Sequence, residues 1–428
     1  QRARQAKASF DLTPADIPAL IRICKMVDGM PLGLELAASW VRYMSCQEIA
    51  DEVARSLDFL STKMRNVPQR HRSLRAVFEQ SWGRLPDEEQ AVLKRMAIFR
   101  GGCVREAAQA VANARLPQLS ALVDKALLRY EHNGRYEMHE LIRQFALEQL
   151  QADPDEYQRA QHEHGRYFTA FLEKHTASFR GGRQSEALAE IAAELDNIRA
   201  AWRHVVVDRH LESLEVLHRG LGVFYWLQGW FAEARDTFRL AIEALKADVD
   251  PPTKQQRILV ELLVSFSTHS QFQGKQEPAE IALEEALALA ERLDAPDITA
   301  AVLERQARLA NAQGDHLRAK TLGEKALSLY RDLGDVANVA HVLSHQGRAN
   351  LFLQDFDTAR EQLEASAAYY RQQSNLPELT VSLNNLARVL LKIGAFPEAK
   401  RIMQEIVALN QQMETPVHAS AYNNLGQV

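Results

Sequence analysis

The second half of the chain repeats itself with a period of 40 residues, and this repeat restricts the folds open to the chain more than any other feature. One turn-forming position recurs in each period, at Gly274, Gly314, Gln354 and Gly394. Small side chains recur five and twelve residues later, with one departure at the last position: Ala279, Ala319, Ala359 and Ala399, then Ala286, Ala326, Ser366 and Ile406. Small residues let antiparallel helices approach closely, and glycine permits the tight turn between them. Because such hairpins gain a core only by stacking, the period predicts an α-solenoid.

The repeat pattern continues on both sides of these four units. An earlier unit with Gly229, Ala234 and Ala241 precedes the first by 45 residues, and helical patterns extend back to residue 155. At the other end, Asn423-Asn424-Leu425-Gly426 resembles the stretch that begins with Asn384-Asn385, but no second helix follows it. We therefore assign residues 153–428 to a tetratricopeptide-like repeat domain and expect it to be cut inside its last repeat.

The first 66 residues carry the signals of a small helical domain. Thr13 followed by Pro14 is typical of a helix start, with a capping hydroxyl and proline at the first helical position. Pro31 begins a second helix in the same way, and Ser45 with Glu48 predicts a capping box for a third.

Residues 67–152 differ in pattern from the segments on either side. Helical patterns cover roughly 72–83, 87–97, 104–112 and 117–126. Asn133-Gly134 then separates two short β-prone runs, which predicts a hairpin, and a helix follows from His139. Helices, a hairpin and a further helix in this order are typical of a winged helix. The predicted fold class is thus mostly α: a helical domain and a winged helix with one β-hairpin, followed by the solenoid.

The net charge of −5 is unevenly distributed. Residues 1–150 contain 22 Lys and Arg against 18 Asp and Glu, a net +4, and the remainder contains 29 against 38, a net −9. This difference supports separate domains in the two parts. Neither value is the strong basic excess of a dedicated nucleic-acid-binding protein.

Hydropathy and cysteine usage predict a cytoplasmic protein. No window approaches about 20 uninterrupted apolar residues, so neither a membrane span nor a membrane partner is expected. Cys24, Cys46 and Cys103 are far apart, odd in number and without metal-ligand spacing, as in a reducing compartment. The chain begins at Gln1 rather than Met, and we expect it to be part of a longer protein.

Four short segments, taken in order, resemble motifs of one family of signalling proteins. They are Gly29-Met30-Pro31-Leu32, RHRSLRAVFEQSW at 70–82, Met138-His139-Glu140 and LDNIRAAW at 195–202. In the same order, they resemble four parts of STAND signalling ATPases: the GLPL motif, the junction of the helical and winged-helix domains, the MHD motif and the start of the helical sensor. These are relatives of NB-ARC proteins, here of the AfsR and MalT-like bacterial regulator type. The resemblance covers nearly the whole chain, although Glu140 stands where the plant-type motif has Asp.

The resemblance implies a switch controlled by ADP and ATP. In this family an upstream P-loop domain binds the nucleotide, and the helical and winged-helix domains close over it at rest. Pro31 would then lie against the adenine, and His139 would contact the β-phosphate of ADP, where a helix N-terminus favours negative charge. From the residues alone, Pro31 is equally explained as the first residue of a helix, and His139 as a cap or a packed histidine.

The sequence lacks the residues that hydrolyse nucleotide. It contains no Gly-x-x-x-x-Gly-Lys-[Ser/Thr] and no apolar strand that ends in paired acids. We therefore expect no catalytic residues and no enzymatic activity in this chain, with ATP or ADP bound only by the intact parent. The resemblance implies two kinds of partner: a nucleotide-binding domain upstream of Gln1 and, in the activated protein, further copies in an oligomer.

Arginine recurs at one position of the first helix in three successive repeats: Arg308, Arg348 and Arg388. In tetratricopeptide geometry one face of each first helix lines a groove, so these side chains should form a ladder along it. One helical turn before each arginine stand Glu304, Ser344 and Asn384. The planar guanidinium suits carboxylate and phosphate. We interpret the ladder, with Asn384, as a groove for an effector: an acidic peptide, a small anion or another domain. The alternative is that the arginines pair with glutamates such as Glu304 and Glu364.

Three other features give weaker signals. The aromatic cluster of Phe224, Tyr225, Trp226 and Trp230 is expected to be core, with a ligand pocket as the alternative. His162 and His164 are two residues apart and so on different faces of a helix, which predicts no metal site. Arg70, His71, Arg72 and Arg75 form a basic patch, but the family uses this domain as a switch, so DNA is not expected as a partner.

The features together predict the regulatory and sensor part of a signal-transduction ATPase or transcriptional regulator. The repeats would bind the effector, and the helical and winged-helix domains would relay that event by releasing ADP. A passive protein-binding scaffold and a DNA-binding regulator remain as alternatives. The sequence names neither the effector nor the output pathway.

Overall fold

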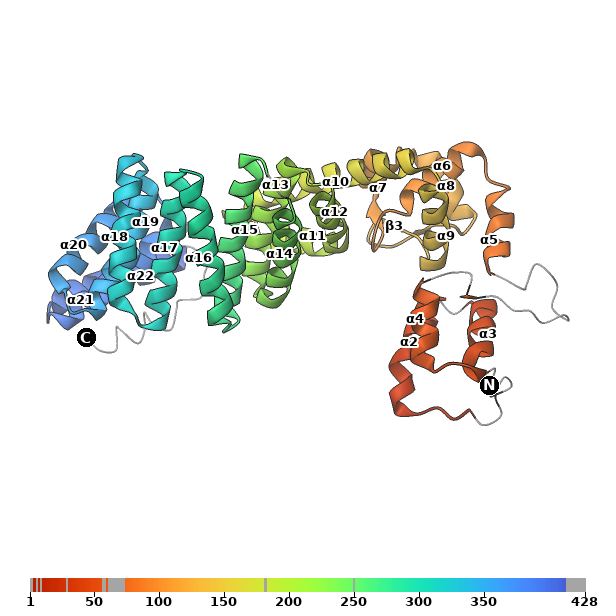
Figure 1. The fold of residues 1–428 in the computed structure, drawn as a ribbon, viewed down its shortest axis with the longest axis horizontal. Coiled ribbons are helices and arrows are strands. Elements are labelled where there is room, and N and C mark those ends of the chain that lie inside the picture. Colours follow the sequence, from red (N-terminus) through yellow and green to blue (C-terminus); the bar gives the residue numbers. More distant parts are fainter. Residues whose placement is uncertain are drawn as a thin grey trace. The chain divides into compact units, whose positions relative to one another are not determined.

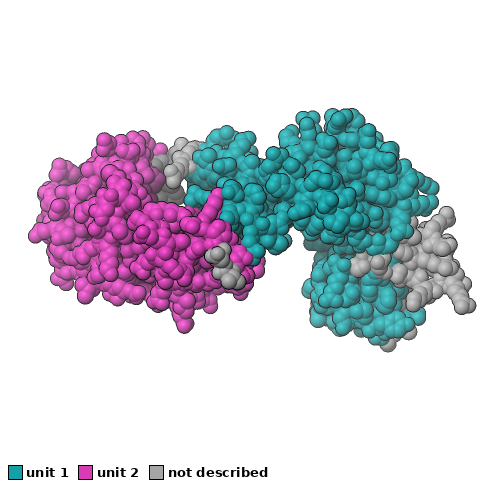
Figure 2. Space-filling view, turned by 45° about the horizontal axis from the view of Figure 1, so that its top comes forward, with its two compact units in different colours: residues 1–220 teal, residues 221–428 magenta. Residues whose placement is uncertain are grey.

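A computed structural model describes residues 3–4, 7, 10–27, 30–55, 59–60, 74–180, 183–248 and 251–412. The chain divides into two compact units, Gln1–Gly220 (unit 1) and Leu221–Val428 (unit 2), shown in different colours in Figure 2. The described residues are mostly helical with one three-stranded sheet, which confirms the predicted fold class. None of the helices in these ranges has the length and apolar character needed to cross a bilayer.

The N-terminal helices begin at the predicted capping residues. The backbone N–H and hydroxyl of Thr13 donate to Asp16 Oδ2 at 3.1 and 2.6 Å, at the start of η1 (Pro14–Asp16) and α2 (Ile17–Met26). Ser45 and Glu48 cap α4 reciprocally, with distances of 2.8 Å from Ser45 N to Glu48 Oε2 and 3.3 Å from Glu48 N to Ser45 Oγ. The remaining elements here are α3 (Pro31–Ser39), η2 (Trp40–Arg42) and α4 (Cys46–Arg55). Their buried faces share a core with Leu141 and Phe145 of α9.

The following region has the predicted order of helices, hairpin and helix. Its helices are α5 (Leu74–Trp82), α6 (Asp87–Met96), α7 (Arg105–Ala112), α8 (Leu116–Asp124) and α9 (Glu140–Gln151), and its strands are β1 (Cys103–Val104), β2 (Arg129–Tyr130) and β3 (Arg135–Glu137). The predicted hairpin joins β2 to β3, with Tyr130 opposite Tyr136 and Gly134 at φ +79°. The sequence did not predict β1, which pairs antiparallel with the other side of β3.

Parts of three sequence motifs lie outside the described residues. They are Gly29 of the first motif, residues 70–73 of the second and the Asn423–Gly426 stretch of the last repeat.

A glycine allows β1 to lie against β3. Gly102 has φ +74°, and a Cβ at this position would lie 2.6 Å from the Tyr136 carbonyl oxygen. Only a residue without a side chain therefore fits between the two backbones. Next to it, Cys103 is completely buried, and burial raises the pKa of its thiol, so this cysteine stays protonated.

The LDNIRAAW segment anchors the sheet to the helices that follow it. Those helices are α10 (Pro154–Thr176), η5 (Ala177–Arg180), α11 (Gln184–Ala193) and α12 (Leu195–Val207). Asn197 of α12 accepts a hydrogen bond from Arg100 N at 2.7 Å and donates to the Gly102 carbonyl at 2.9 Å. Beside it, Arg135 of β3 forms a buried ion pair with Glu194. These contacts join residues 59 to 97 positions apart in the chain.

A buried histidine makes the stability of unit 1 sensitive to acid. His164 of α10 is 2% exposed and packs against Phe99 and Phe168. Burial, together with the nearby His204 and Arg100, lowers its pKa to about 4, although contact with Asn197 opposes this. In the unfolded chain the pKa of histidine is about 6.5, so between these values the unfolded state binds more protons.

The free energy of unfolding of unit 1 should therefore fall by about 3 kcal/mol as the pH falls from about 6.5 to about 4. His164→Gln should remove most of this slope, as measured by urea unfolding at a series of pH values. His132→Gln, at an exposed histidine of the hairpin loop, is the matched control and should leave the slope unchanged. An unchanged slope in His164→Gln would show that other groups cause the loss of stability in acid.

Unit 2 is a stack of helical hairpins (Figure 1). Its helices, of which the first begins in unit 1, are α13 (Leu211–Gln228), α14 (Phe231–Lys246), α15 (Thr253–Phe272), α16 (Gln276–Arg292), α17 (Pro296–Gln313), α18 (His316–Asp332), α19 (Val336–Phe352), α20 (Phe356–Gln372), α21 (Leu376–Lys392) and α22 (Phe396–Gln412). From α14 onward each helix packs against the next, and α15, α17, α19 and α21 also contact one another in succession. We call the surface formed by these four helices the first-helix face.

The repeat positions behave as the sequence predicts. The four turn residues all have positive φ, from +63° at Gln354 to +84° at Gly314, so Gln354 adopts the glycine-like conformation despite its side chain. The small residues of the repeat, and the larger Ile406 at the last position, are all 2% exposed or less: Ala279, Ala286, Ala319, Ala326, Ala359, Ser366, Ala399 and Ile406. The predicted α-solenoid is confirmed.

Candidate ligand-binding site on the repeat unit

The three arginines of the predicted ladder lie on neighbouring helices of the first-helix face. Arg308 is on α17, Arg348 on α19 and Arg388 on α21, at equivalent positions of three hairpins. Arg348 is exposed, whereas Arg308 and Arg388 are half-buried. Asn384 lies one turn before Arg388 and is also half-buried. The repeat thus places all four predicted residues on one face.

The ladder arginines have few ionic partners. Arg308 Nη1 lies 3.9 Å from Glu304 Oε1, a long contact, while Glu364 pairs with Arg360 at 2.8 Å instead. In the described part of the chain, neither Arg348 nor Arg388 forms an ion pair, and Arg388 lies over the Phe352 ring at 5.2 Å from its centroid. Burial and the neighbouring Arg348 lower the pKa of Arg388.

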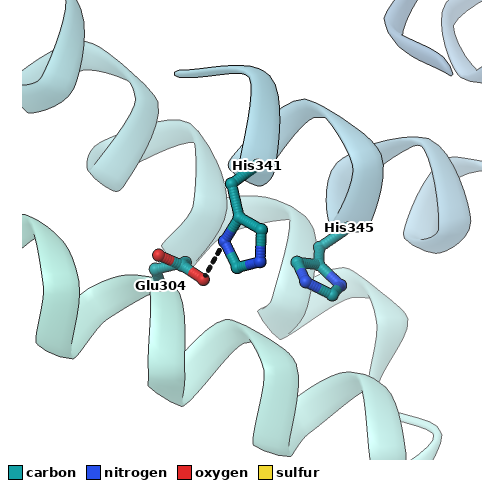
Figure 3. Close-up of side chains that lie close together, drawn as sticks. All are labelled: Glu304, His341 and His345. Carbon is teal, nitrogen blue, oxygen red and sulfur yellow. Dashed lines mark ion pairs between the residues drawn. The ribbon is translucent and has the colours of Figure 1, made fainter. Parts of the chain in front are cut away.

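Two histidines, which the sequence analysis did not single out, lie beside the ladder. His341 and His345 are one turn apart on α19 and face Glu304 of α17, with one ligand atom of each residue within 4.8 Å of the others (Figure 3). His341 Nδ1 is 2.8 Å from Glu304 Oε1. The repeat gives no recurring signal for His341, because Ala301 and Val381 occupy the equivalent positions of the neighbouring repeats.

The charged surroundings of His345 favour its neutral form. Burial lowers its pKa well below the usual value, and Arg308, His341, Arg348 and Arg305 lower it further. The carboxylate of Glu304 does not cancel this positive field. This part of the face is therefore electropositive even though unit 2 belongs to the acidic part of the chain.

The two residues predicted to contact nucleotide lie at helix starts in unit 1. Pro31 is exposed and is the first residue of α3. His139 caps α9: its Nδ1 accepts a hydrogen bond from the Leu141 N–H at 3.1 Å. A neutral His139 that accepts through Nδ1 carries its proton on Nε2. Both positions match the structural alternatives given above: Pro31 is the first residue of a helix, and His139 is a cap.

A small cavity adjoins the Met138-His139-Glu140 motif. Its volume is about 90 Å³, and its lining includes Arg100, Glu140, Arg143 and the backbone at Gly101. Arg143 donates to both carboxylate oxygens of Glu140, at 2.7 and 2.8 Å, and to the Ala97 carbonyl at 3.2 Å. Burial works against the charged form of Glu140, but Arg143 outweighs it and lowers the pKa of the carboxyl. The carboxylate of Glu140 thus holds the Arg143 side chain in place.

The weaker candidates are not assembled into sites. His162 is exposed and His164 buried, on different faces of α10. Phe224 and Tyr225 are completely buried, while Trp226 and Trp230 are each 39% exposed. Arg75 of the basic patch pairs with Glu148 at 2.6 Å, and Arg70, His71 and Arg72 lie outside the described residues.

Sequence comparison relates the chain to bacterial regulators. Over 252 residues, 56% of this chain, it is 30% identical to HTH-type transcriptional regulators of Mycobacterium tuberculosis and Mycobacterium bovis, of which the match covers 28%. Over 409 residues, 92% of this chain, it is 23% identical to regulatory protein AfsR of Streptomyces griseus, of which the match covers 38%. The chain thus spans less than half the length of these relatives. No protein-family profile matches it.

Solved structures with similar helices superpose only partly. A STAND protein with a tetratricopeptide repeat sensor from Pyrococcus horikoshii matches 99% of this chain and 61% of its own, at 15% identity and a TM-score of 0.43. A Rap protein complexed with competence and sporulation factor matches 58% of this chain and 78% of its own, at 14% identity and a TM-score of 0.42. These scores do not establish a shared fold. By its sequence, the chain is a relative of bacterial regulatory proteins, and it carries a tetratricopeptide-like repeat unit.

Proposed function

We propose that this chain is the regulatory and sensor part of a nucleotide-switched transcriptional regulator of the STAND type. The repeat unit binds an effector peptide or protein on the first-helix face, and unit 1 relays that event through its contacts with ADP. The sequence match to AfsR supports this proposal because it runs through residues of both units.

The observation that carries the sensor role is the row of arginines on the first-helix face. Arg348 and Arg388 have no ion pair within the described ranges, although unit 2 is rich in carboxylates. On the second helix of the same hairpin as Arg348, Arg360 and Arg371 each have a glutamate partner, at 2.8 Å from Glu364 and Glu405. Guanidinium groups kept free of carboxylates on one face are available to an acidic partner.

The nucleotide role rests on the family resemblance and on the position of His139. At the start of α9 its ring lies beside the helix N-terminus, where backbone N–H groups and the helix dipole favour an anion. We propose that ADP or ATP binds in a longer, cytoplasmic protein containing this chain, and that this chain does not itself hydrolyse ATP.

Loss of the His139 contact should activate the regulator. We expect His139→Ala in the longer protein to raise basal transcription from its target promoter by about tenfold, the effect of losing about 1.4 kcal/mol of resting-state stabilisation. A reporter gene measures the output, and tight retention of ADP by the purified protein should be lost in parallel.

His132→Ala, at an exposed histidine of the hairpin loop, is the matched control and should leave both output and ADP retention unchanged. Unchanged basal output in His139→Ala, at a normal protein level, would contradict the switch. It would favour the passive scaffold, for which changes of His139 affect stability only. The DNA-binding alternative receives no support from Arg75, because its guanidinium pairs with Glu148.

A further inference from the structure

Arg305 is a buried cation whose charge is poorly compensated. It lies on α17 and is 7% exposed. Its Nη2 donates to Gln271 Oε1 at 3.3 Å, while its buried Nε has no hydrogen-bond partner among the described residues. Burial and the neighbouring Arg308 lower its pKa to about 9, and Glu304 offsets this only in part. A buried guanidinium without a carboxylate is unfavourable, and an arriving anion relieves that cost.

The surroundings of Arg305 hold more positive than negative charge. Arg308 lies on the same helix, and Arg348 lies on α19, one turn beyond His345. Glu304 is the carboxylate of this cluster, and it already contacts His341 at 2.8 Å and Arg308 at 3.9 Å. Glu304 also interacts with Tyr330, whose pKa is raised by burial and by this carboxylate. The charge of Glu304 is thus shared among several groups, and it offsets the positive charge of Arg305 only in part.

The same cluster contains a set of groups that suits a metal ion. Two histidines four residues apart on a helix and a facing carboxylate are ligands that zinc accepts (Figure 3). A divalent cation here, however, would lie beside Arg305, Arg308 and Arg348. These guanidinium groups all lie close enough to His345 to act on it electrostatically. Three positive groups near one site repel a metal cation and attract an anion, so the charges favour an anion.

We propose that Arg305, Arg308 and Arg348 form a binding site for an oxyanion, a carboxylate or phosphoryl group, on the first-helix face of the repeat unit. The planar forks of Arg308 and Arg348 contact the oxygens of the anion, and Arg305 supplies buried positive charge from below. Recognition of an effector through this site rests on the proposed sensor role, whereas binding of a simple anion does not depend on nucleotide switching.

Thermal unfolding of the full chain tests this site. Sodium phosphate and sodium acetate serve as separate probes, at an ionic strength held constant with sodium chloride. At ten times its dissociation constant, the preferred anion should raise the Tm of unit 2 by about 2–4 °C, and the stronger response identifies phosphoryl or carboxylate as the preferred group. Arg305→Met should abolish this shift and should also raise the Tm without ligand, because it removes the uncompensated charge. A purely structural role for Arg305 would give a lower Tm in the variant.

Matched variants separate the outcomes. Arg348→Gln, at an exposed position, should weaken the shift, and Arg331→Gln, at an exposed arginine of α18, should leave it unchanged. A phosphate or acetate shift that persists in Arg305→Met or Arg348→Gln overturns the proposal. So does a larger shift with zinc chloride that His345→Ala abolishes, because the cluster would then be a metal site. Anion binding without a response to His139→Ala keeps this site and rejects only the nucleotide switch.

Discussion

Glu194→Ala should lower the free energy of unfolding of unit 1 by about 3–5 kcal/mol, because it leaves the buried guanidinium of Arg135 without a carboxylate. Arg135 and Glu194 are 8% and 5% exposed. Their ion pair includes a second contact of 3.2 Å, from Arg135 Nη2 to Glu194 Oε2, and Arg135 Nη2 also donates to the Gly101 and Gly102 carbonyls at 3.2 and 3.0 Å. Asn197 donates to Glu194 Oε2 at 2.8 Å. The substitution therefore disrupts the connection between β3 and α12 as well as one ion pair.

Unfolding in urea measures this loss, and an exposed ion pair of the same unit provides the control. Glu186 of α11 pairs at 2.8 Å with Arg183, the residue just before this helix, and both side chains are exposed. Glu186→Ala should leave the free energy of unfolding nearly unchanged, because solvent screens an exposed ion pair. Arg135→Met combined with Glu194→Met should recover much of the loss, because no charge then remains buried. Equal effects of Glu194→Ala and Glu186→Ala would show that burial does not strengthen the first pair.

Gly347→Ala should destabilise unit 2 by about 2–3 kcal/mol, because the added methyl group overpacks the core of the solenoid. A Cβ on Gly347 would lie 2.4 Å from Leu363 Cγ and 2.9 Å from its Cδ2. Leu363 is completely buried in the core shared by α19, α20, α21 and α22, so it has little room to move. Alanine is a better helix former than glycine by about 1 kcal/mol, but the steric conflict outweighs this gain.

A second helical glycine gives a control with the opposite sign. Gly222 of α13 would place its Cβ 3.7 Å from Phe238 Cζ, an ordinary van der Waals distance. Gly222→Ala should therefore stabilise unit 2 by up to about 1 kcal/mol. The double variant Gly347→Ala with Leu363→Ala should cost less than the sum of its single changes, since the smaller side chain makes room for the methyl group. Urea unfolding compares all four variants, and stabilisation by Gly347→Ala would contradict the close packing of α19 against α20.

Local sequence signals predicted much of the fold. Ser45 and Glu48 are three positions apart, so the hydrogen bonds of their capping box could be inferred from spacing alone. Asn133-Gly134 placed the hairpin in the same way. By contrast, β1 has only two residues, and it becomes a strand because Gly102 and Cys103 lie against Tyr136, more than thirty positions away. A short strand that depends on such a distant partner leaves no periodic pattern in the sequence.

The candidate site was predicted in part, for a related reason. The arginine ladder could be recognised because Arg308, Arg348 and Arg388 recur with the period of the repeat. Arg305, His341 and His345 were missed because they occupy positions where the repeats differ, and a search for recurring residues overlooks them. The predicted nucleotide contacts of Pro31 and His139 stay predictions, with their positions at helix starts now known.

The sequence by itself determined the helices, their caps and turns, and the stacking of the repeat unit. These follow from interactions between near neighbours and from a period that brings equivalent residues to equivalent places. Only the tertiary structure decided which charged side chains are compensated. Arg135 and Arg305 are both buried arginines, but the first faces Glu194 from 59 positions away, while the second has an amide neighbour and no carboxylate pair in the described ranges. Because the free energy of a buried charge depends on groups brought close by folding, the sequence around each arginine could not distinguish them.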